Sequence, residues 1–280
     1  MILDGRVVAA DIKQRIKDDI DEAVANGCRR PKLVIITVGD DPASKVYVRN
    51  KIKAAEEVGI VTKHYCFAID DESEAVLELI GRLNDAPTID GIMVQLPLPK
   101  GWDERAIIDA INPAKDVDGL TTTNIGRLRS GQDCLKPCTA AGIIDLCKYY
   151  DIELEGKDVT IIGRSNIVGK PLADMMMAAG ATITQCHSKT SDVRFHTLPA
   201  DIVVTAIGKP KFVDMGYIGD ERVVIDVGIN RDEEGRLCGD VDFDSVKDYC
   251  SAITPVPGGV GPMTVAELMK NVVIAWKNNR

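Results

Sequence analysis

The stretch VTIIGRSNIVGKPLA, residues 159–173, joins an apolar run of strand length to a glycine-containing turn and the start of a helix. A Rossmann phosphate turn has this order of elements, and the amides at its helix N-terminus bind a phosphate. Here the spacing is G-x-S-x-x-x-G rather than G-x-G-x-x-G, with Gly163, Ser165 and Gly169 at the defining positions. Gly163 permits a tight turn, and Ser165 is small and carries a hydroxyl donor. Alone, the stretch fits a cofactor site and a plain tight turn equally well.

The residues after the next predicted strand favour NADP over NAD. An NAD site usually carries an acid at the end of the second strand, where it binds the ribose 2′-hydroxyl. Here the strand at 181–186 is followed by His187-Ser188-Lys189 without an acid, and Arg164 lies in the first turn. These groups suit a 2′-phosphate better than a free hydroxyl. The sequence therefore predicts NADP, with Arg164 and Ser188 near the ribose.

Helix and strand patterns alternate on both sides of this turn. Strands that read as unbroken apolar runs indicate a parallel sheet covered on both faces. The predicted strands are 32–39, 61–67, 89–96, 158–163, 181–186, 201–208 and 222–229, and the predicted helices are 4–26, 42–58, 73–84, 103–110, 139–150, 168–179 and a last one ending near 277. Residues 112–139 interrupt the pattern and are predicted as the inter-domain region, and 254–264 as a final loop. The fold class predicted is two α/β units.

Composition excludes several classes of protein. The chain has 280 residues, 45% hydrophobic and 28% charged, which is typical of a globular protein of two ordinary domains. Its net charge of -9 argues against a general nucleic-acid binder. No apolar run reaches the ~18 residues of a membrane span, and the N-terminus lacks a signal peptide. Eight scattered cysteines without a CxxC pair predict reduced thiols and no metal site. We expect a cytoplasmic protein.

The first α/β unit carries its own candidate residues. Ser44, Tyr47 and Lys51 share one face of the helix predicted at 42–58, because they stand at i, i+3 and i+7. The alternative is a surface stripe with a solvated lysine. Gln95 ends a buried strand at the carboxyl edge, where open α/β sheets bind ligands. The two acids within 115–119 are open to a turn-forming role as well.

Five motifs together resemble those of the bifunctional methylenetetrahydrofolate dehydrogenase/cyclohydrolase (FolD) family. They are VGDDPASKVYVRNK (38–51), VQLPLP (94–99), KDVDG (115–119), GRSNIVGKP (163–171) and TPVPGGVGPMT (254–264). The resemblance covers essentially the whole chain, and PGGVGPMT is its most specific part. One departure is Ala140, where the family commonly has proline in P-C-T-P-x-G. The change loosens a helix start but removes no functional group.

The resemblance implies a fold, two reactions and an assembly. The expected domains are a folate-binding catalytic domain, 1–120 plus the helix 265–280, and an NADP-binding Rossmann domain, 139–264, with the active-site cleft between them. NADP oxidises 5,10-methylenetetrahydrofolate to the methenyl cation, and water then opens this cation to 10-formyltetrahydrofolate. The family also implies a homodimer and a role in purine biosynthesis.

The residue roles follow from the resemblance together with the chemistry. Hydride loss from an aminal carbon needs mainly positioning, whereas hydrolysis needs a proton shuttle, which a lysine of lowered pKa can supply. Lys51 is assigned as this shuttle, with Gln95 and Tyr47 holding it and the substrate. Ser44 and Tyr47 contact the folate. Asp118 is suited to accept two hydrogen bonds from the aminopyrimidine edge of the pterin.

The remaining site residues belong to the second unit. The family's PGGVGP loop borders the folate and the nicotinamide, so its small residues are expected to allow close backbone approach. These are Gly258, Gly259, Gly261 and Pro262, with Gly228 and Ile229 on the nicotinamide side. The cofactor set is Gly163, Arg164, Ser165, Ser188, Gly228 and Ile229.

Three alternatives remain open at this point. A monofunctional dehydrogenase of the same family is the most serious. An amino-acid or shikimate-type dehydrogenase shares the Rossmann half, but does not call for Tyr-x-x-x-Lys together with VQLPLP. A non-enzymatic NADP-sensing module needs no lysine shuttle.

Overall fold

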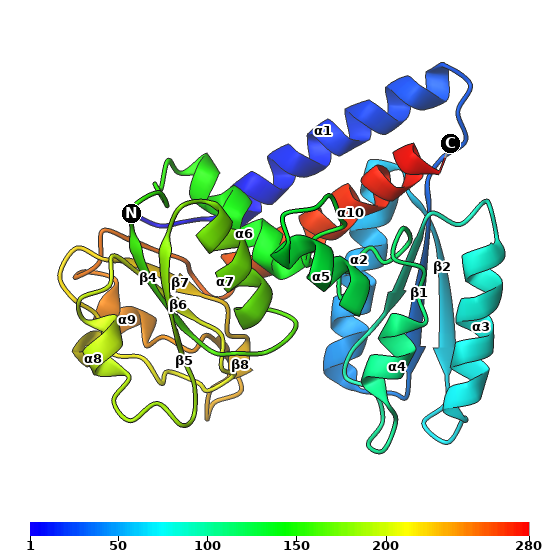
Figure 1. Ribbon diagram of the computed structural model, residues 1–280. Helices are drawn as coiled ribbons and strands as arrows, with labels where there is room; N and C mark the ends of the chain where they lie inside the picture. Colours follow the sequence, from blue (N-terminus) through cyan, green and yellow to red (C-terminus); the bar gives the residue numbers. More distant parts are fainter. Residues whose placement is uncertain (280) are drawn as a thin grey trace. The chain divides into compact units, whose positions relative to one another are not determined.

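The computed structural model describes residues 1–279, except the side chain of Ala43, and divides into two compact units. One unit is built on a three-stranded sheet and comprises residues 10–138 together with the chain from Val265 onward. The other is built on a five-stranded sheet and comprises residues 1–9 and 139–264. We call them the three-stranded unit and the five-stranded unit. Figure 1 shows their elements, coloured along the sequence.

The sheet of the three-stranded unit is parallel, with strand order β2-β1-β3. Its strands and helices are β1 (Lys32–Val38), β2 (Val61–Phe67), β3 (Gly91–Val94), α2 (Pro42–Val58), α3 (Ser73–Asp85), α4 (Glu104–Asp109) and α5 (Thr122–Arg129). Ile92 also forms a parallel bridge to Asp116, which continues the sheet beyond β3. Two long helices, α1 (Gly5–Ala25) and α10 (Val260–Asn278), have most of their residues in this unit.

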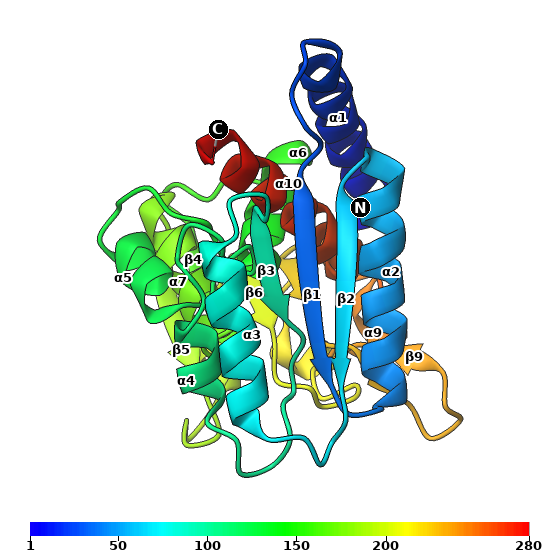
Figure 2. The ribbon, with the colours of Figure 1, turned by 90° about the vertical axis from the view of Figure 1, so that its right-hand side faces the viewer.

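Alternate side chains of β1 and β3 enter two separate cores. Leu33, Ile35 and Met93 pack with residues of α1, α2 and α10. Val34 and Ile36 pack on the other side, with residues of α3 and α4. Figure 2 shows α2 and α3 on either side of the strands. The unbroken apolar runs thus have the cause expected for parallel strands, since both faces of the sheet are covered.

The helix that carries the first candidate residues begins and ends where the sequence predicts. The Asp41 side chain accepts a hydrogen bond from the Ser44 amide at 2.7 Å, and Pro42 occupies the first helical position. Gly59 ends the helix in the left-handed conformation at φ 87°. These are the standard N-cap and C-terminal signals, and they fix where α2 begins and ends.

The five-stranded unit is a doubly wound parallel sheet. Its order is β10-β7-β6-β4-β5. If these strands are numbered 1 to 5 along the chain and read from β5, the order is 2-1-3-4-5, whereas the dinucleotide-binding Rossmann sheet has 3-2-1-4-5-6. Its elements are α6 (Cys138–Tyr149), β4 (Asp158–Ile162), α7 (Gly169–Ala178), β5 (Thr182–Cys186), α8 (Arg194–Thr197), β6 (Ile202–Thr205), a 3₁₀ turn (Met215–Tyr217), β7 (Val223–Asp226), the antiparallel pair β8 (Asn230–Arg231) and β9 (Leu237–Cys238), α9 (Phe243–Val246) and β10 (Ala252–Ile253). The predicted fold class, two α/β units with parallel sheets, is confirmed.

Three segments differ from the prediction. Residues 112–139 contain α5 and belong with the three-stranded unit, up to Cys138, instead of forming an inter-domain loop. Residues 1–9 group with the five-stranded unit, where Ile2 bridges Ile253 and the Leu3 amide donates to the Ile253 carbonyl at 2.8 Å. The final loop is shorter than predicted because α10 already begins at Val260. The chain therefore passes between units inside α1 and α10 and at the start of α6.

Among the described residues, none of the helices combines the length and apolar character that a membrane span requires.

Candidate functional site

The structure brings Lys51 and Gln95 together. Lys51 is only 9% exposed, and its ammonium donates to Gln95 Oε1 at 3.1 Å and to the sulfur of Met93 at 3.3 Å. Gln95 is itself held at two points. Its backbone amide donates to the Ile36 carbonyl at 2.8 Å, and its side-chain Nε2 donates to the Leu96 carbonyl at 2.7 Å. In the described part of the chain Lys51 has no acidic partner. A buried ammonium with neutral acceptors alone is costly, which makes Lys51 a candidate functional residue.

Burial along this face of α2 is greatest at Lys51. Ser44 is half-buried, Tyr47 is 37% exposed and Lys51 is buried. The three residues share one helix face, as the i, i+3 and i+7 spacing predicts. Lys51 is therefore not a solvated surface lysine. Its ammonium lies beside the sulfur of Met93, a residue of the core.

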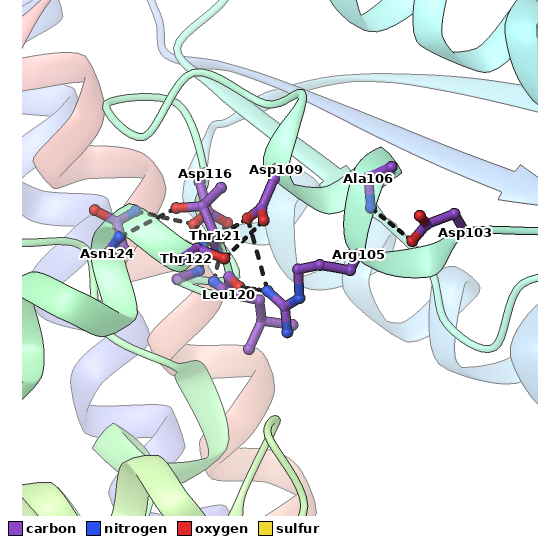
Figure 3. Close-up of polar contacts among 10 residues, drawn as sticks. Asp103, Arg105, Ala106, Asp109, Asp116, Leu120, Thr121, Thr122 and Asn124 are labelled. Carbon is purple, nitrogen blue, oxygen red and sulfur yellow. Dashed lines mark hydrogen bonds and ion pairs between the residues drawn. The ribbon is translucent and has the colours of Figure 1, made fainter.

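The two acids of KDVDG have opposite environments. Asp116 is buried and accepts from the amides of Gly119 and Leu120 through Oδ1, at 3.0 and 3.2 Å, and from the Thr121 amide through Oδ2 at 2.8 Å. Asn124 adds a side-chain donor at 2.9 Å (Figure 3). Burial raises the pKa of Asp116, although these donors act to lower it. Asp116 is thus committed to holding the loop.

Asp118, two residues on, is half-buried and makes no hydrogen bond or ion pair with any described residue. The pKa of the Cys138 thiol lies well above its ordinary value, mainly because the thiol is buried and secondly because of the charge of Asp118. Asp118 therefore lies near Cys138. The loop that carries Asp118 is held on both sides. Asp116 binds it from within, and Arg105 donates to the Leu120 carbonyl at 2.8 Å (Figure 3). A free carboxylate on a rigid loop is suited to bind a polar ligand edge.

The turn after β4 in the five-stranded unit offers amides to a ligand. Ser165 Oγ accepts from the Val168 and Gly169 amides at 3.2 and 3.4 Å, which leaves its own hydroxyl proton to donate. The amides of residues 164–167 donate no hydrogen bond within the described chain. A Cβ on Gly163, whose φ is 130°, would lie 2.4 Å from the Ala206 carbonyl oxygen. The turn therefore fits an anion, as at other helix N-termini of nucleotide-binding folds.

The turn also lies where a doubly wound sheet binds its ligand. β4 pairs with β5 on one side and with β6 on the other, so the strand order reverses direction between β4 and β6. Ligands of open α/β sheets bind outside the carboxyl ends of the strands at this point. The altered strand order thus leaves the expected place of the cofactor unchanged.

Arg164 and Ser188 follow neighbouring strands at one edge. β4 and β5 end together, with Ile162 opposite Cys186, so the residues that follow them leave the sheet side by side. Arg164, Ser188 and Lys189 are exposed. In the described chain the Arg164 guanidinium has neither a hydrogen bond nor an ion pair. These groups remain available to a phosphate.

The glycines of PGGVGP serve the protein itself as well as a ligand. The Gly5 amide donates to the Gly258 carbonyl at 2.9 Å, and a Cβ on Gly5 would lie 1.9 Å from the Gly259 oxygen. Gly258 has φ 113°. Gly261 lies in the first turn of α10 with Pro262, and a Cβ there would meet Ile229 at an ordinary 3.7 Å. A Cβ on Gly258 would lie 3.2 Å from the Arg6 side chain, and one on Gly259 would lie 2.7 Å from the Pro255 carbonyl oxygen. Close packing within the protein thus explains these two glycines, which the sequence reasoning attributed to ligand approach alone.

Gly228 is buried, and a Cβ there would lie 2.3 Å from Asp240 Oδ1, whereas Ile229 is exposed. Sequence reasoning missed Asp240 and its neighbour Asp226, which hold this loop. The signal for Asp226 is present in VVID, where an acid ends a buried apolar strand. No cluster of three metal-ligating side chains occurs among the described residues.

The fold and the sites define a class of protein. A doubly wound sheet with a glycine-containing turn that offers free amides is typical of nucleotide-binding proteins, and the second α/β unit adds a buried lysine beside a glutamine. The catalytic-domain model of tetrahydrofolate dehydrogenase/cyclohydrolase matches residues 3–118, and the NAD(P)-binding-domain model of the same family matches residues 137–280. The chain belongs to the tetrahydrofolate dehydrogenase/cyclohydrolase family.

Individual relatives are similar over their full length. The bifunctional protein FolD of Agathobacter rectalis is 50% identical over 276 residues, which cover 99% of both chains. The FolD crystal structure from Campylobacter jejuni has 43% identity and a TM-score of 0.97, covering 100% of this chain and 99% of the other. The Trypanosoma brucei FolD structure, complexed with NADP cofactor and inhibitor, has 36% identity and a TM-score of 0.95, with coverage of 99% and 97%.

The predicted family and enzyme class are confirmed, and the matched NAD(P)-binding domain bears out a nicotinamide dinucleotide cofactor. The chain is a methylenetetrahydrofolate dehydrogenase/cyclohydrolase, an oxidoreductase and hydrolase.

Proposed function

We propose that Lys51 is the proton shuttle of the cyclohydrolase reaction. The observation that carries the proposal is its buried ammonium, which donates only to the neutral acceptors Gln95 and Met93. Water addition to the methenyl cation releases a proton, and ring opening requires one at the departing nitrogen. A lysine held by a fixed glutamine can transfer both, because general acid–base groups act within hydrogen-bond reach.

Gln95 and Tyr47 serve this lysine and the folate by positioning. Gln95 is fixed through the Ile36 and Leu96 carbonyls, so its oxygen fixes the Lys51 ammonium in turn. Tyr47 and Ser44 lie on the more exposed part of the same helix face, which is available to a substrate. Asp118 accepts two hydrogen bonds from the aminopyrimidine edge of the pterin, since its carboxylate has no partner within the described chain.

The five-stranded unit holds NADP at the carboxyl edge of its sheet. When bound, NADP accepts a hydride from the methylene carbon of the folate. The amides of residues 164–167 and the Ser165 hydroxyl bind its phosphates, and Arg164 and Ser188 bind the 2′-phosphate. Gly228 and Ile229 form the nicotinamide side, and Gly258, Gly259, Gly261 and Pro262 border the folate and the nicotinamide. The hydride transfer asks no acid or base of the protein, so its demand is for orientation.

A single assay tests the proposed function. NADPH appearance and methenyltetrahydrofolate decay are followed in one cuvette, from methylenetetrahydrofolate and NADP. Both signals are expected, with methenyl product consumed after it forms. NADPH appearance with stable methenyl product indicates a monofunctional dehydrogenase and contradicts the role of Lys51. Binding of NADP without either signal indicates a sensing module and refutes the enzyme.

We further propose that the protein is a cytoplasmic homodimer that supplies formyl groups for purine biosynthesis. The family resemblance supports the dimer and the pathway. The eight cysteines are all unpaired thiols, which fits a reducing compartment. Light scattering at micromolar concentration is expected to give twice the chain mass of 30.3 kDa, and a monomeric mass contradicts the dimer.

A further inference from the structure

Two buried acids tie together the loops at the carboxyl edge of the five-stranded sheet. Asp226 ends β7 and is 3% exposed, and Asp240 follows β9 and is fully buried. Neither forms an ion pair with any described residue. Carboxylates are rarely buried unless paired, so their environment needs a separate account.

Asp240 holds the loop that follows β6. Its Oδ2 accepts from the Ile207 and Gly208 amides at 2.7 and 3.2 Å, and its Oδ1 accepts from the Lys209 amide at 2.8 Å. The Asn230 side chain also donates to Oδ1, at 2.9 Å. Three successive backbone amides donate to this one carboxylate, and they fix a loop that lies outside any helix or strand.

Asp226 holds the next loop and Asp240 itself. Its Oδ1 accepts from the Gly228 amide at 2.9 Å and the Asp240 amide at 3.0 Å, and its Oδ2 accepts from the Val241 amide at 2.8 Å. The Thr205 hydroxyl, at the end of β6, donates to Oδ1 at 3.2 Å. The two acids thus form one network that reaches from β6 to β7.

The network abuts backbone that we assign to the cofactor. Asp240 lies against Gly228, where any Cβ would clash with it. The loop it holds begins directly after Ala206, whose carbonyl oxygen lies against Gly163 of the phosphate turn. A shift in either acid therefore moves the loops that follow β6 and β7, beside the switch point between β4 and β6.

We propose that Asp226 and Asp240 are positioning residues, which fix the 207–209 and 228–229 loops so that NADP binds in the orientation that hydride transfer needs. The proposal rests on the proposed cofactor site. Eight donors, six of them backbone amides, replace the counter-ion that a buried carboxylate pair usually has. Misplacement of a bound reactant by about 1 Å can cost roughly 10²-fold in rate, so rigid loops matter more here than net stability.

The experiment compares three variants by NADP affinity and by both activities. Asp240→Asn keeps the shape of the side chain but replaces one acceptor oxygen with a donor amide that opposes a backbone N–H. We expect its Kd for NADP to rise at least tenfold and its kcat for hydride transfer to fall. Thr205→Val removes only the hydroxyl bond to Asp226 and is expected to raise the Kd by roughly threefold to fivefold. The exposed Asp244→Asn is the matched control and should change nothing.

The cyclohydrolase rate, measured on methenyl substrate without NADP, distinguishes positioning from general damage. It should stay within about twofold of the unaltered protein, because no proposed proton-transfer group lies in the network. Equal loss of both activities, or folded variants with unchanged NADP affinity, would overturn the proposal. If Asp240→Asn does not fold, Thr205→Val decides alone by the same criteria. Failure of the proposed function is seen separately, as absence of both activities in the unaltered protein.

Discussion

The two units share a topology but build different kinds of site on it. Both sheets place their second strand beside the first and the third strand on the other side, as β2-β1-β3 and as β5-β4-β6. In the three-stranded unit the candidate residues are the Lys51 and Gln95 side chains, which follow the first and third strands. In the five-stranded unit the candidates follow β4, β5 and β7, and glycine backbone and free amides are prominent among them. Topology sets the place of a site, and residue type sets its chemistry.

The difference between the two sites follows from the chemistry that we propose for each. Moving a proton requires a side chain with an exchangeable proton, fixed in the low-dielectric interior. Binding a polyphosphate requires several donors and space for close approach, which glycine and a helix N-terminus supply. One device is common to both units. Asp116 in one, and Asp226 with Asp240 in the other, hold a ligand loop by accepting its amides.

The largest effect is expected at Lys51. Lys51→Met keeps much of the length and the apolar stem but removes the proton carrier, so cyclohydrolase activity should fall by ~10²–10⁴-fold. Dehydrogenase activity should fall less, so that methenyl product accumulates in the coupled assay. Lys53→Met, two residues away and exposed, is the matched control. Loss of hydride transfer with hydrolysis intact would refute the shuttle and break the proposed division between the units.

Asp118→Asn should weaken both reactions together. The asparagine amide replaces one acceptor with a donor, and a hydrogen bond to a charged group contributes roughly 1.5–3 kcal/mol, so a loss of about 10²-fold in kcat/KM is expected. Asp133→Asn, at an exposed position of the same unit, should have no effect. A loss confined to one activity would make Asp118 a participant in that chemical step instead of a binding group.

Asp226 of the five-stranded unit should make the free energy of unfolding depend on pH. Burial raises the pKa of Asp226 from 3.8 to about 6, with the charge of Asp240 acting in the same direction. The folded state therefore binds this proton more tightly, and the free energy of unfolding should decrease as pH rises from 4 to 6, by about 2 kcal/mol from this group. Denaturant unfolding across that range measures it. Asp226→Asn should lack this component, and identical pH profiles for both proteins would contradict it.

The smallest effect concerns cofactor choice. The unaltered protein should use NADP at least tenfold better than NAD in kcat/KM, since a charge-assisted contact to the 2′-phosphate contributes roughly 1.5–3 kcal/mol. Arg164→Ala should shrink this preference by about tenfold without changing the NAD reaction. Arg236→Ala, on the exposed β8–β9 hairpin, is the control. Equal use of both cofactors by the unaltered protein would sink the assignment.

Local signals in the sequence predicted the regular elements closely. The helix predicted at 42–58 has its Asp-Pro start and glycine end as expected, and each long apolar run became a parallel strand. The prediction failed where local signals are weak. α5 was hidden in a Thr- and Gly-rich stretch, and α8, α9 and β10 are too short for a hydrophobic period to register.

The sequence by itself determined the family, the two reactions and the candidate residues, because motif order and residue type are properties of the chain. It left two questions to the tertiary structure. Whether Lys51 is solvated depends on β3 bringing Met93 and Gln95 to it from more than forty residues away. Which acid of KDVDG is free depends on the loop folding its amides onto Asp116 and leaving Asp118 without them. Burial and hydrogen-bond partners arise from contacts distant in the chain, and no local pattern encodes them.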